Sequence, residues 1–493
     1  MADLITQALQ DATDTKAVVI GEGAIGQAGQ VFKDLFGPVQ AVVVADERTF
    51  ELAGKQVSSA LAAAGVELAT PHVFPGDPEL YAKYENCEAL RDILAPLDAV
   101  AVAVGSGTLN DIVKRASGEL GRRYMVVGTA ASMDGYTAFG ASIALDGFKQ
   151  TLSCPAPYGC IADLALMAAA PQVMTASGYG DLLGKVPAGA DWILADVLGA
   201  EAIDQSVWEL VQGPLRGALS RPADLAAGDV SATGDLVEGL VMSGLAMQAH
   251  QSSRPASGAE HQFSHLWEME GHGVDVTPRR LSHGFKVGIG TVAIAALYER
   301  LLERDLSDLD IDSVVAAWPA RDAMETEVRR LHPDPRLVEE TVVQALTKWL
   351  PPEQLRARLE LLASVWSDVS VRLRNQLLPA NELQEMLRAA GAPAHPQDIG
   401  LDWERFRATY TRAQMIRKRY TVLDLALETG LLDVLVDELF APDGFWGRPA
   451  PRAGPRETEG DTYEQSSCRN RFRHPLGAGG RRICGGREDS RER

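Results

Sequence analysis

Five short apolar runs, separated by segments with helical spacing of apolar residues, constrain the fold of this 493-residue chain more than any other feature. The runs lie at residues 17–20, 39–46, 67–74, 98–104 and 122–128. Strands that alternate with helices form a parallel sheet that is covered by helices on both faces. We therefore predict an α/β domain at residues 1–162.

The turns after three of these runs carry residues suited to a dinucleotide. The first run enters Gly-Glu-Gly-Ala-Ile-Gly at residues 21–26, which has the G-x-G-x-x-G spacing, and the second ends on Asp46, where a dinucleotide fold binds the ribose hydroxyls. The fourth enters Gly105-Ser106-Gly107-Thr108, and a glycine turn before a helix is an anion site. We expect Thr108 and Asp111 to cap that helix. Either loop could equally be a tight turn, and the pattern alone does not rank them.

The chain changes character after the α/β part. From Ile161 to about Pro442 the apolar spacing is helical, which predicts an all-helical domain at residues 163–442. The remainder, residues 443–493, is rich in Gly, Pro and Arg, contains no lysine and shows no apolar period. Such a composition cannot bury enough apolar surface to order the chain, so we predict a dispensable, disordered tail.

Two aspartates are candidates for a site. Asp134, beside Gly135 in a loop of small and polar residues, suits a loop that presents its carboxylate to a cleft, and it equally fits an Asx-turn. Asp181 precedes an apolar helical run, so it could be only an acid at a helix start.

The totals exclude some classes of function. A formal charge of -20 argues against non-specific binding to nucleic acid or to anionic membranes, although an anionic substrate responds only to local charge. The first residues lack the pattern of a signal peptide, and no apolar run is long enough to span a bilayer. Five cysteines in so long a chain do not make a disulfide framework. We therefore expect a cytoplasmic protein without membrane insertion.

Residues 257–290 hold four of the nine histidines: His261, His265, His272 and His283. Ser257 and Glu260 have the spacing of a capping box, which predicts that a helix begins there. The first two histidines then share one helix face, and the helix N-terminus favours neutral imidazole, the form that binds metal. His283 could complete a site, while histidines at this spacing also merely cap or pack.

Seven pieces of sequence occur in a distinctive order: VGSGTLNDIVK, GTAASMDGYT, DGFKQT, GYGDLLGK, ADWILAD, GAEHQFSHLWEM and HGFKVGIG. In this order they resemble bacterial sn-glycerol-1-phosphate dehydrogenase, in the superfamily of iron-type alcohol dehydrogenases, glycerol dehydrogenase and dehydroquinate synthase. With Asp46 they span residues 46–290, and the combination is far more specific than any one piece.

The resemblance implies an α/β dinucleotide-binding domain, an all-α domain and a catalytic cleft between them. It implies a divalent metal, which could be zinc, nickel or iron, on Asp181, His261 and His283. His265 and Asp134 would then face the substrate, Asp181 would touch both metal and substrate, and these three would be the catalytic residues. A homodimer is the expected assembly.

The resemblance also ranks the two glycine loops. It assigns the pyrophosphate to Gly105, Ser106, Gly107 and Thr108, with Thr129 and Ser132 nearby, and makes residues 21–26 an accidental match. Asp46 would still bind the ribose hydroxyls and so favour NAD(H), while Arg48, two residues later, would allow NADP(H) as well.

The chain departs from the family in several places. Superfamily members often carry three glycines where this chain has Gly-Ser-Gly, and Ala138 stands where relatives have a serine near the cofactor. His272 has no family role, and the helical segment after Gly290 is long.

We expect reduction of dihydroxyacetone phosphate to sn-glycerol 1-phosphate. The alternatives are dehydrogenation of glycerol or another polyol, a phosphate-eliminating cyclase, and a nucleotide-binding scaffold without activity.

Overall fold

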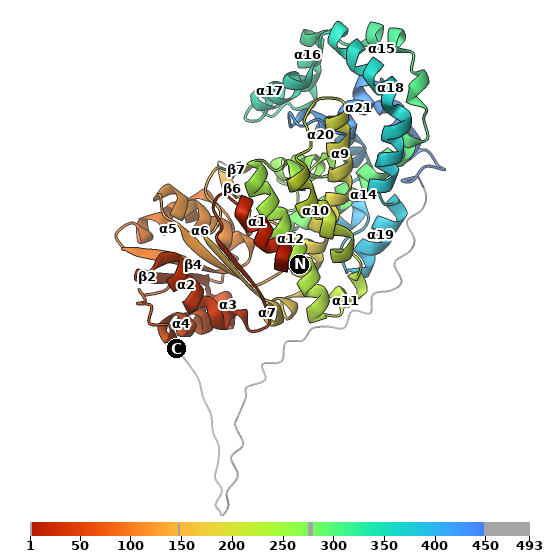
Figure 1. Ribbon diagram of the computed structural model, residues 1–493. Coiled ribbons are helices and arrows are strands. Elements are labelled where there is room, and N and C mark those ends of the chain that lie inside the picture. Colours follow the sequence, from red (N-terminus) through yellow and green to blue (C-terminus); the bar gives the residue numbers. More distant parts are fainter. Residues whose placement is uncertain (1, 146–147, 275–279, 448–493) are drawn as a thin grey trace, which may run out of the picture. The chain divides into compact units, whose positions relative to one another are not determined.

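A parallel sheet of six strands organises the first part of the chain (Figure 1). Its strands are β1 (Ala17–Gly21), β2 (Gln40–Asp46), β3 (His72–Phe74), β4 (Ala99–Gly105), β5 (Tyr124–Gly128) and β8 (Gly159–Asp163). They lie in the order β1-β8-β5-β4-β2-β3, and every pairing is parallel. All the carboxyl ends therefore meet at one edge of the sheet, as the alternation of runs predicts.

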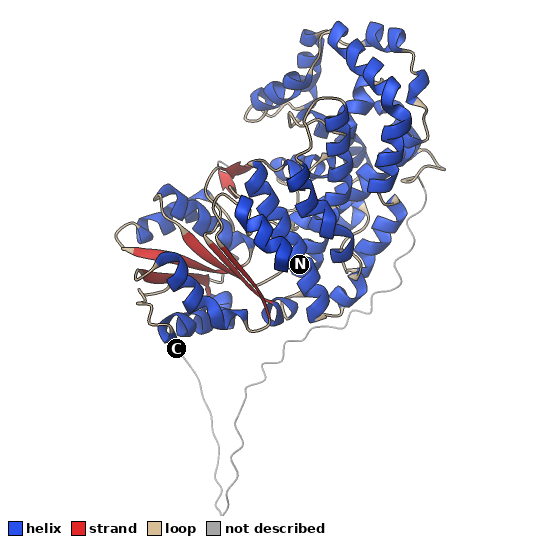
Figure 2. Ribbon diagram, viewed as in Figure 1, coloured by secondary structure: helices blue, strands red, loops and turns tan. Residues whose placement is uncertain are grey.

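Helices cover both faces of this sheet (Figure 2). Val43 and Val102 pack under α2 (Ala28–Phe36) and α4 (Lys55–Ala63), whereas Val42 and Val44 pack under α5 (Tyr84–Leu94) and α6 (Gly107–Glu119). Successive strand residues point to opposite faces, so a strand buried on both faces reads as a continuous apolar run. This burial explains why the runs were visible in the sequence.

The last strand of the sheet was not predicted. The helical pattern was placed from Ile161 onward, and this is wrong, because Gly159–Asp163 forms β8 between β1 and β5. A short, fully buried run cannot be distinguished from a helix segment by periodicity. An antiparallel hairpin, β6 (Ala141–Leu145) and β7 (Phe148–Leu152), was also missed.

The chain after β8 is helical, as predicted (Figure 2). The helices are α7 (Leu164–Ala168), α8 (Gln172–Leu183), α9 (Lys185–Val197), α10 (Gln205–Ala218), α11 (Pro222–Ala226), α12 (Val230–His250), α13 (Ala259–Met269), α14 (His283–Leu302), α15 (Ile311–Ala317), α16 (Arg321–Leu331), α17 (Val338–Lys348), α18 (Pro352–Gln376), α19 (Ala380–Ala389), α20 (Trp403–Met415), α21 (Val422–Glu428) and α22 (Leu432–Phe440). At the start of the chain, α1 (Ala2–Asp11) packs on α12, and α3 (Glu47–Thr49) follows β2.

Helix α14 is the centre of the helical part. It is buried on nearly all sides, and α8 and α13 both pack against it. A helix with apolar residues all round has to be enclosed by other elements. The three helices that meet here carry the candidate metal ligands.

The computed structural model describes residues 2–145, 148–274 and 280–447, which belong to one compact unit. The division into domains at residue 162 stays a prediction. The predicted boundary of the tail at residue 443 is wrong for its first residues, because Trp446 is 4% exposed and its Nε1 donates to the Tyr410 hydroxyl at 2.9 Å. The rest of the predicted tail, residues 448–493, lies outside the described residues. Among those described, no helix is both long and apolar enough to cross a membrane.

Candidate active site

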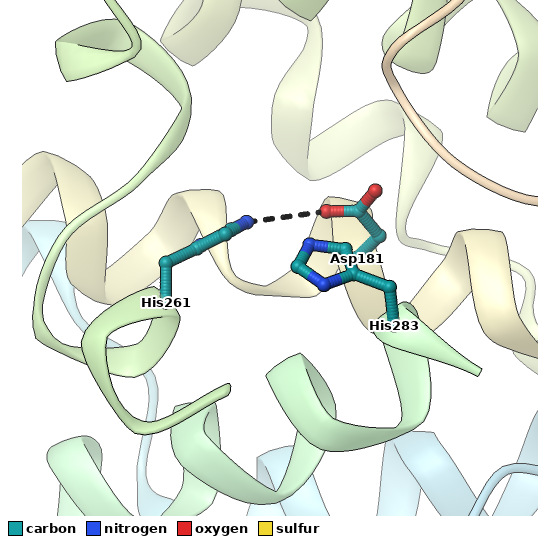
Figure 3. A group of neighbouring side chains, drawn as sticks. All are labelled: Asp181, His261 and His283. Atoms are coloured by element: carbon teal, nitrogen blue, oxygen red, sulfur yellow. Dashed lines mark ion pairs between the residues drawn. The ribbon is translucent and has the colours of Figure 1, made fainter. Parts of the chain in front are cut away.

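Asp181, His261 and His283 come together at the meeting point of α8, α13 and α14 (Figure 3). Each contributes one ligand atom, and these three atoms all lie within 4.8 Å of one another. The Asp181 carboxylate is completely buried, and His261 Nε2 lies 3.5 Å from its Oδ1. Sequence reasoning grouped these residues, and the fold brings them together.

Glycines allow these helices to come close enough. A Cβ on Gly284, next to His283, would stand 1.8 Å from the Ser177 carbonyl oxygen, and one on Gly180, next to Asp181, would stand 2.5 Å from the Gly284 oxygen. Any side chain at either position would push α8 away from the start of α14. The glycines of GYGD and HGFK thus allow a close backbone contact between α8 and α14, and this contact places Asp181 near His283.

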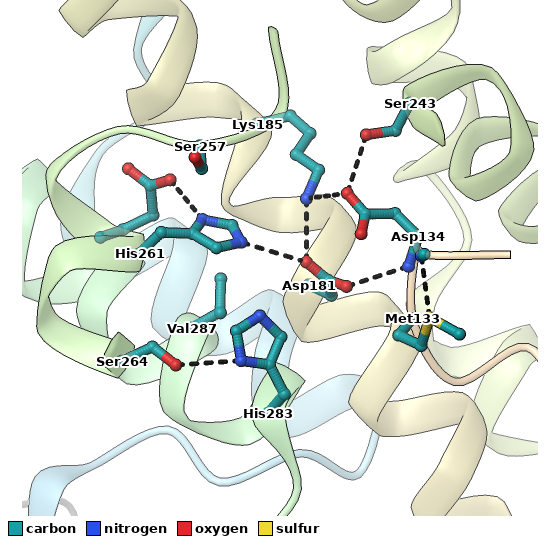
Figure 4. Close-up of polar contacts among 12 residues, drawn as sticks. Met133, Asp134, Asp181, Lys185, Ser243, Ser257, His261, Ser264, His283 and Val287 are labelled. Carbon is teal, nitrogen blue, oxygen red and sulfur yellow. Dashed lines mark hydrogen bonds and ion pairs between the residues drawn. The ribbon is translucent and has the colours of Figure 1, made fainter. Parts of the chain in front are cut away.

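Two glutamates orient the histidine rings. His261 Nδ1 lies 2.7 Å from Glu260 Oε1, and His283 Nδ1 lies 2.9 Å from Glu268 Oε1. His283 Nδ1 also lies 3.2 Å from the Ser264 hydroxyl (Figure 4). A ring that donates its Nδ1 proton to a carboxylate keeps Nε2 free as a ligand, which is the usual arrangement around metal-bound histidines. The donor set of one carboxylate and two imidazoles therefore fits a divalent metal.

The start of α13 differs from the prediction. The N-cap is Gly258, without a side-chain cap, and the Ser257 hydroxyl donates to the Ser253 carbonyl, so the Ser257–Glu260 capping box is wrong. The reason is tertiary: the buried Asp191 accepts the Ala259 N–H at 2.7 Å. This carboxylate satisfies the helix start in place of a local side chain.

The two histidines of α13 have different electrostatic surroundings. Burial lowers the pKa of His261, but its hydrogen bonds with Asp181 and Glu260 outweigh burial and raise the pKa above its ordinary value. The two carboxylates thus act on His261 in the opposite direction to the expected effect of the helix start. Burial, and then the charge of Arg417, hold the pKa of His265 well below its usual range, so His265 is neutral.

Lys185 is a site residue that sequence reasoning missed. Its ammonium is fully buried and lies 2.8 Å from Asp181 Oδ1 and 2.9 Å from Asp134 Oδ2 (Figure 4). Burial alone would lower the pKa of Lys185, but Asp134 and Asp181 raise it overall. Burial favours protonation of Asp181, yet Lys185 and the histidines hold its pKa well below the ordinary range. The spacing of four residues between Asp181 and Lys185 was the one available signal.

The two aspartates lie side by side. The Asp134 N–H donates to Asp181 Oδ2 at 3.1 Å, and the Asp134 carboxylate accepts from the Ser243 hydroxyl at 2.9 Å. Asp134 therefore reaches across to α9 and α12. Asp181 lies in the last turn of α8, so its interpretation as a helix-start acid is wrong.

A cavity of about 1390 Å³ opens beside this group. Its wall includes the predicted residues Asp46, Ser106, Gly107, Thr108, Thr129, Ser132, Asp134, His261, His265 and His283. Gly105 ends β4 directly behind them, and Asp181 is buried behind His261 and Asp134. The cavity runs from the carboxyl edge of the sheet to the helical part, as a catalytic cleft requires.

The two glycine loops differ in their relation to this cavity. Residues 106–108 of the second loop line it, whereas the loop at 21–26 leads into a short 3₁₀ helix, where the Ile25 N–H donates to Asp163. Thr108 and Asp111 do not cap α6 as predicted; its N-cap is Ser106, without a side-chain cap, and Asp111 accepts the Ser142 N–H. The first N–H groups of α6 are thus left to a ligand, and an anion is the ligand they suit.

Asp46 has a second task beside the cavity. Its Oδ1 accepts the Thr49 N–H at 2.8 Å and so caps α3, while the residue itself lines the cavity together with Arg48.

His272 lies apart from the metal group: its Nε2 is 2.8 Å from the Ile399 carbonyl oxygen, and Arg405 contacts its Nδ1. It holds two segments together and needs no role in a reaction.

The sequence is similar to known proteins over most of its length. Residues 19–171 match the family described as iron-containing alcohol dehydrogenase. Glycerol-1-phosphate dehydrogenase [NAD(P)+] of Bacillus licheniformis is 33% identical over 350 residues, 66% of this chain and 84% of that protein. The enzyme of the same name from Bacillus subtilis is 31% identical over 395 residues, 79% and 86% of the two chains. Glycerol dehydrogenase from Schizosaccharomyces pombe has the same fold, with a TM-score of 0.54, 16% identity and coverage of 87% and 91%.

Proposed function

Because the chain belongs to the glycerol-1-phosphate dehydrogenase family of the iron-containing alcohol dehydrogenases, we propose that it reduces dihydroxyacetone phosphate to sn-glycerol 1-phosphate with NAD(P)H, reversibly and with a bound divalent metal. The chain is an oxidoreductase of this family. The observation that carries the proposal is the group of Asp181, His261 and His283, with its orienting glutamates, on the wall of a cavity that also contains an uncapped helix start.

We assign the metal to Asp181 and to Nε2 of His261 and His283. A metal with three protein ligands keeps an open position and, when bound, polarises a carbonyl oxygen as a Lewis acid. Zinc, nickel and iron all suit this set of nitrogen and oxygen donors.

We assign the cofactor to the sheet edge. The N–H groups at the start of α6, with Gly105, Ser106, Gly107 and Thr108, would bind the pyrophosphate, and Thr129 and Ser132 line the same wall. Asp46 would bind the ribose hydroxyls and so favour NAD(H), with Arg48 close enough to accept NADP(H). The Gly-Ser-Gly variant does not interfere, because Ser106 is the N-cap and uses no side-chain bond to the helix.

The remaining polar residues would position the substrate and supply a proton. Lys185 lies between the carboxylates of Asp134 and Asp181 and fixes their orientation. Asp134 would accept a hydrogen bond from a substrate hydroxyl. Neutral His265, one turn after His261, lines the cavity and can donate a hydrogen bond to the substrate oxygen that is protonated in the reduction. The cytoplasmic location and the homodimer expected from the sequence stay predictions.

The choice of substrate tests the proposal. The purified protein should oxidise NADH or NADPH with dihydroxyacetone phosphate much faster than with dihydroxyacetone, and the product should be the sn-1 and not the sn-3 phosphate by enantioselective enzymatic analysis. Faster turnover of glycerol or dihydroxyacetone would favour the polyol alternative. Formation of inorganic phosphate would indicate the cyclase chemistry.

A further inference from the structure

The segment after α20 contributes to the wall of the cavity. Its neighbours are tied to the start of α13: Arg419 donates to the Ser257 carbonyl at 2.7 Å, and Arg254 donates to the Tyr420 carbonyl at 3.0 Å. The Lys418 N–H donates to the Gln344 side chain at 2.7 Å. These contacts fix the chain directly after Arg417, which follows the end of α20 at Met415, and Arg417 lines the cavity. The connection between α20 and α21, far downstream of the predicted motifs, thus reaches the cavity.

Arg417 is a half-buried cation without a partner. Within residues 2–145, 148–274 and 280–447, its guanidinium has no hydrogen bond and no ion pair at bonding distance. Its charge acts on His265 and Glu268, and Glu268 holds the His283 ring. A guanidinium that is partly withdrawn from water and left unpaired is unfavourable unless a ligand completes it.

Three other arginines line the described part of the cavity, and each has a different position. Arg48 lies two residues after Asp46, at the cofactor end. Arg336 is exposed and forms an ion pair with Asp334 at 2.8 Å. Arg280 lies face to face with the Tyr81 ring at 4.0 Å, on the side of the α/β part. Of the four, Arg417 is the one with a charge that acts on His265, the residue assigned to the substrate, and both residues line the cavity.

The charges on this part of the wall are mixed. Glu268 forms an ion pair with Lys286 at 3.6 Å, and Glu340 lies on the same cavity wall, in a chain of net charge -20. Arg417 adds a positive charge to this wall, and a positive charge attracts a phosphate. Arginine binds a phosphate through two parallel N–H···O bonds, which a lysine cannot form.

We propose that Arg417 binds the phosphate group of the substrate and determines the preference for a phosphorylated triose over its unphosphorylated form. The proposal rests on the proposed function, since it names the receptor for the phosphate of dihydroxyacetone phosphate. Under this proposal the long part of the chain after Gly290, which contains Arg417, takes part in substrate recognition.

The test is the ratio of kcat/KM for dihydroxyacetone phosphate to kcat/KM for dihydroxyacetone. Arg417→Met should lower this ratio by roughly 10²-fold or more, because a charge-assisted, two-point contact is lost. Arg417→Lys should recover part of it. The ratio cancels any general loss of activity, including an altered His265. Arg336→Met is the matched control, an arginine of the same cavity with its own carboxylate partner, and should leave the ratio within about threefold.

A second measurement needs no turnover. Inorganic phosphate should raise the Tm of the wild-type protein and of Arg336→Met by clearly more than that of Arg417→Met, in which the start of α6 is the anion site that remains. This result would assign the anion site even if the wild-type protein does not reduce dihydroxyacetone phosphate, an outcome that would contradict the proposed function alone. The proposal would be overturned if Arg417→Met left the ratio of the two kcat/KM values unchanged, or if Arg280→Met lowered that ratio instead. So would a changed preference between NADH and NADPH in Arg417→Met, which would assign Arg417 to the phosphates of the cofactor.

Discussion

Replacing Lys185 by methionine should destabilise the metal-free protein by about 3–5 kcal/mol, the usual range for removing one partner of a buried ion pair. Its Nζ lies 2.8 Å from Asp181 Oδ1 and 2.9 Å from Asp134 Oδ2, and nothing replaces its charge between them. The carboxylate of Asp181, which is fully buried, would then lie beside that of Asp134 with no cation between them. The denaturant midpoint of the chelated protein at pH 8 measures the loss, and added zinc should reduce it, since a cation again lies beside Asp181.

Two controls separate this charge effect from a packing defect. Asp134→Asn, introduced together with Lys185→Met, should recover at least half of the lost stability, because it removes one of the repelling charges. Lys348 forms a comparable buried pair with Asp424 at 2.6 Å in another part of the helical region. Lys348→Met should also destabilise, but Asp134→Asn should not relieve it. A loss below about 1 kcal/mol for Lys185→Met, or no recovery in the double variant, would refute the reasoning.

Three further predictions concern the metal, the cofactor and pH. His261→Ala should lose the bound metal in elemental analysis, whereas His265→Ala should keep it and lose roughly 10²-fold in activity; equal metal loss in both would contradict their separate roles. Asp46→Ala should raise the use of NADPH relative to NADH, and an unchanged ratio of kcat/KM would remove Asp46 from cofactor selection. Burial, and then the charge of Glu260, raise the pKa of Asp191 from 3.8 to about 7, so the folded protein holds a proton that the unfolded chain releases. The contribution of Asp191 to stability should therefore be full below about pH 4 and fall by up to about 4 kcal/mol as pH rises through 7, and denaturant midpoints for Asp191→Asn should show a flatter profile over this range.

The parts of the fold that the sequence predicts are those with a local signal. Buried strands appear in the sequence as apolar runs, and helices appear as apolar residues repeated about every 3.6 positions. The sheet and the helices after it could therefore be predicted. Strand β8 was not predicted, because a buried run of only five residues, Gly159–Asp163, is too short for its pattern to distinguish a strand from the start of a helix. Trp446 looked like part of the tail because the aromatic residues that bury it, such as Phe406 and Tyr410, lie far away in the sequence.

The candidate site divides in the same way. Asp181, His261 and His283 were named because their residue types and their order match a family pattern. Lys185 was missed because its place in the site depends on an ion pair with Asp134, which lies in a loop of the α/β part. The capping box was wrong because Asp191, on another helix, accepts the Ala259 N–H at the start of α13. Arg417 had no motif at all, and only the folded chain brings it to the cavity.

The central claim is that Asp181, His261 and His283 hold a divalent metal that the reduction of dihydroxyacetone phosphate requires. The most direct measurement is NAD(P)H oxidation with dihydroxyacetone phosphate before chelation, after chelation and after adding back zinc, nickel or iron. Activity should disappear with the metal and return with at least one of the three ions, and His261→Ala should not regain it. Full activity in a chelated protein shown by elemental analysis to be free of metal would contradict the account.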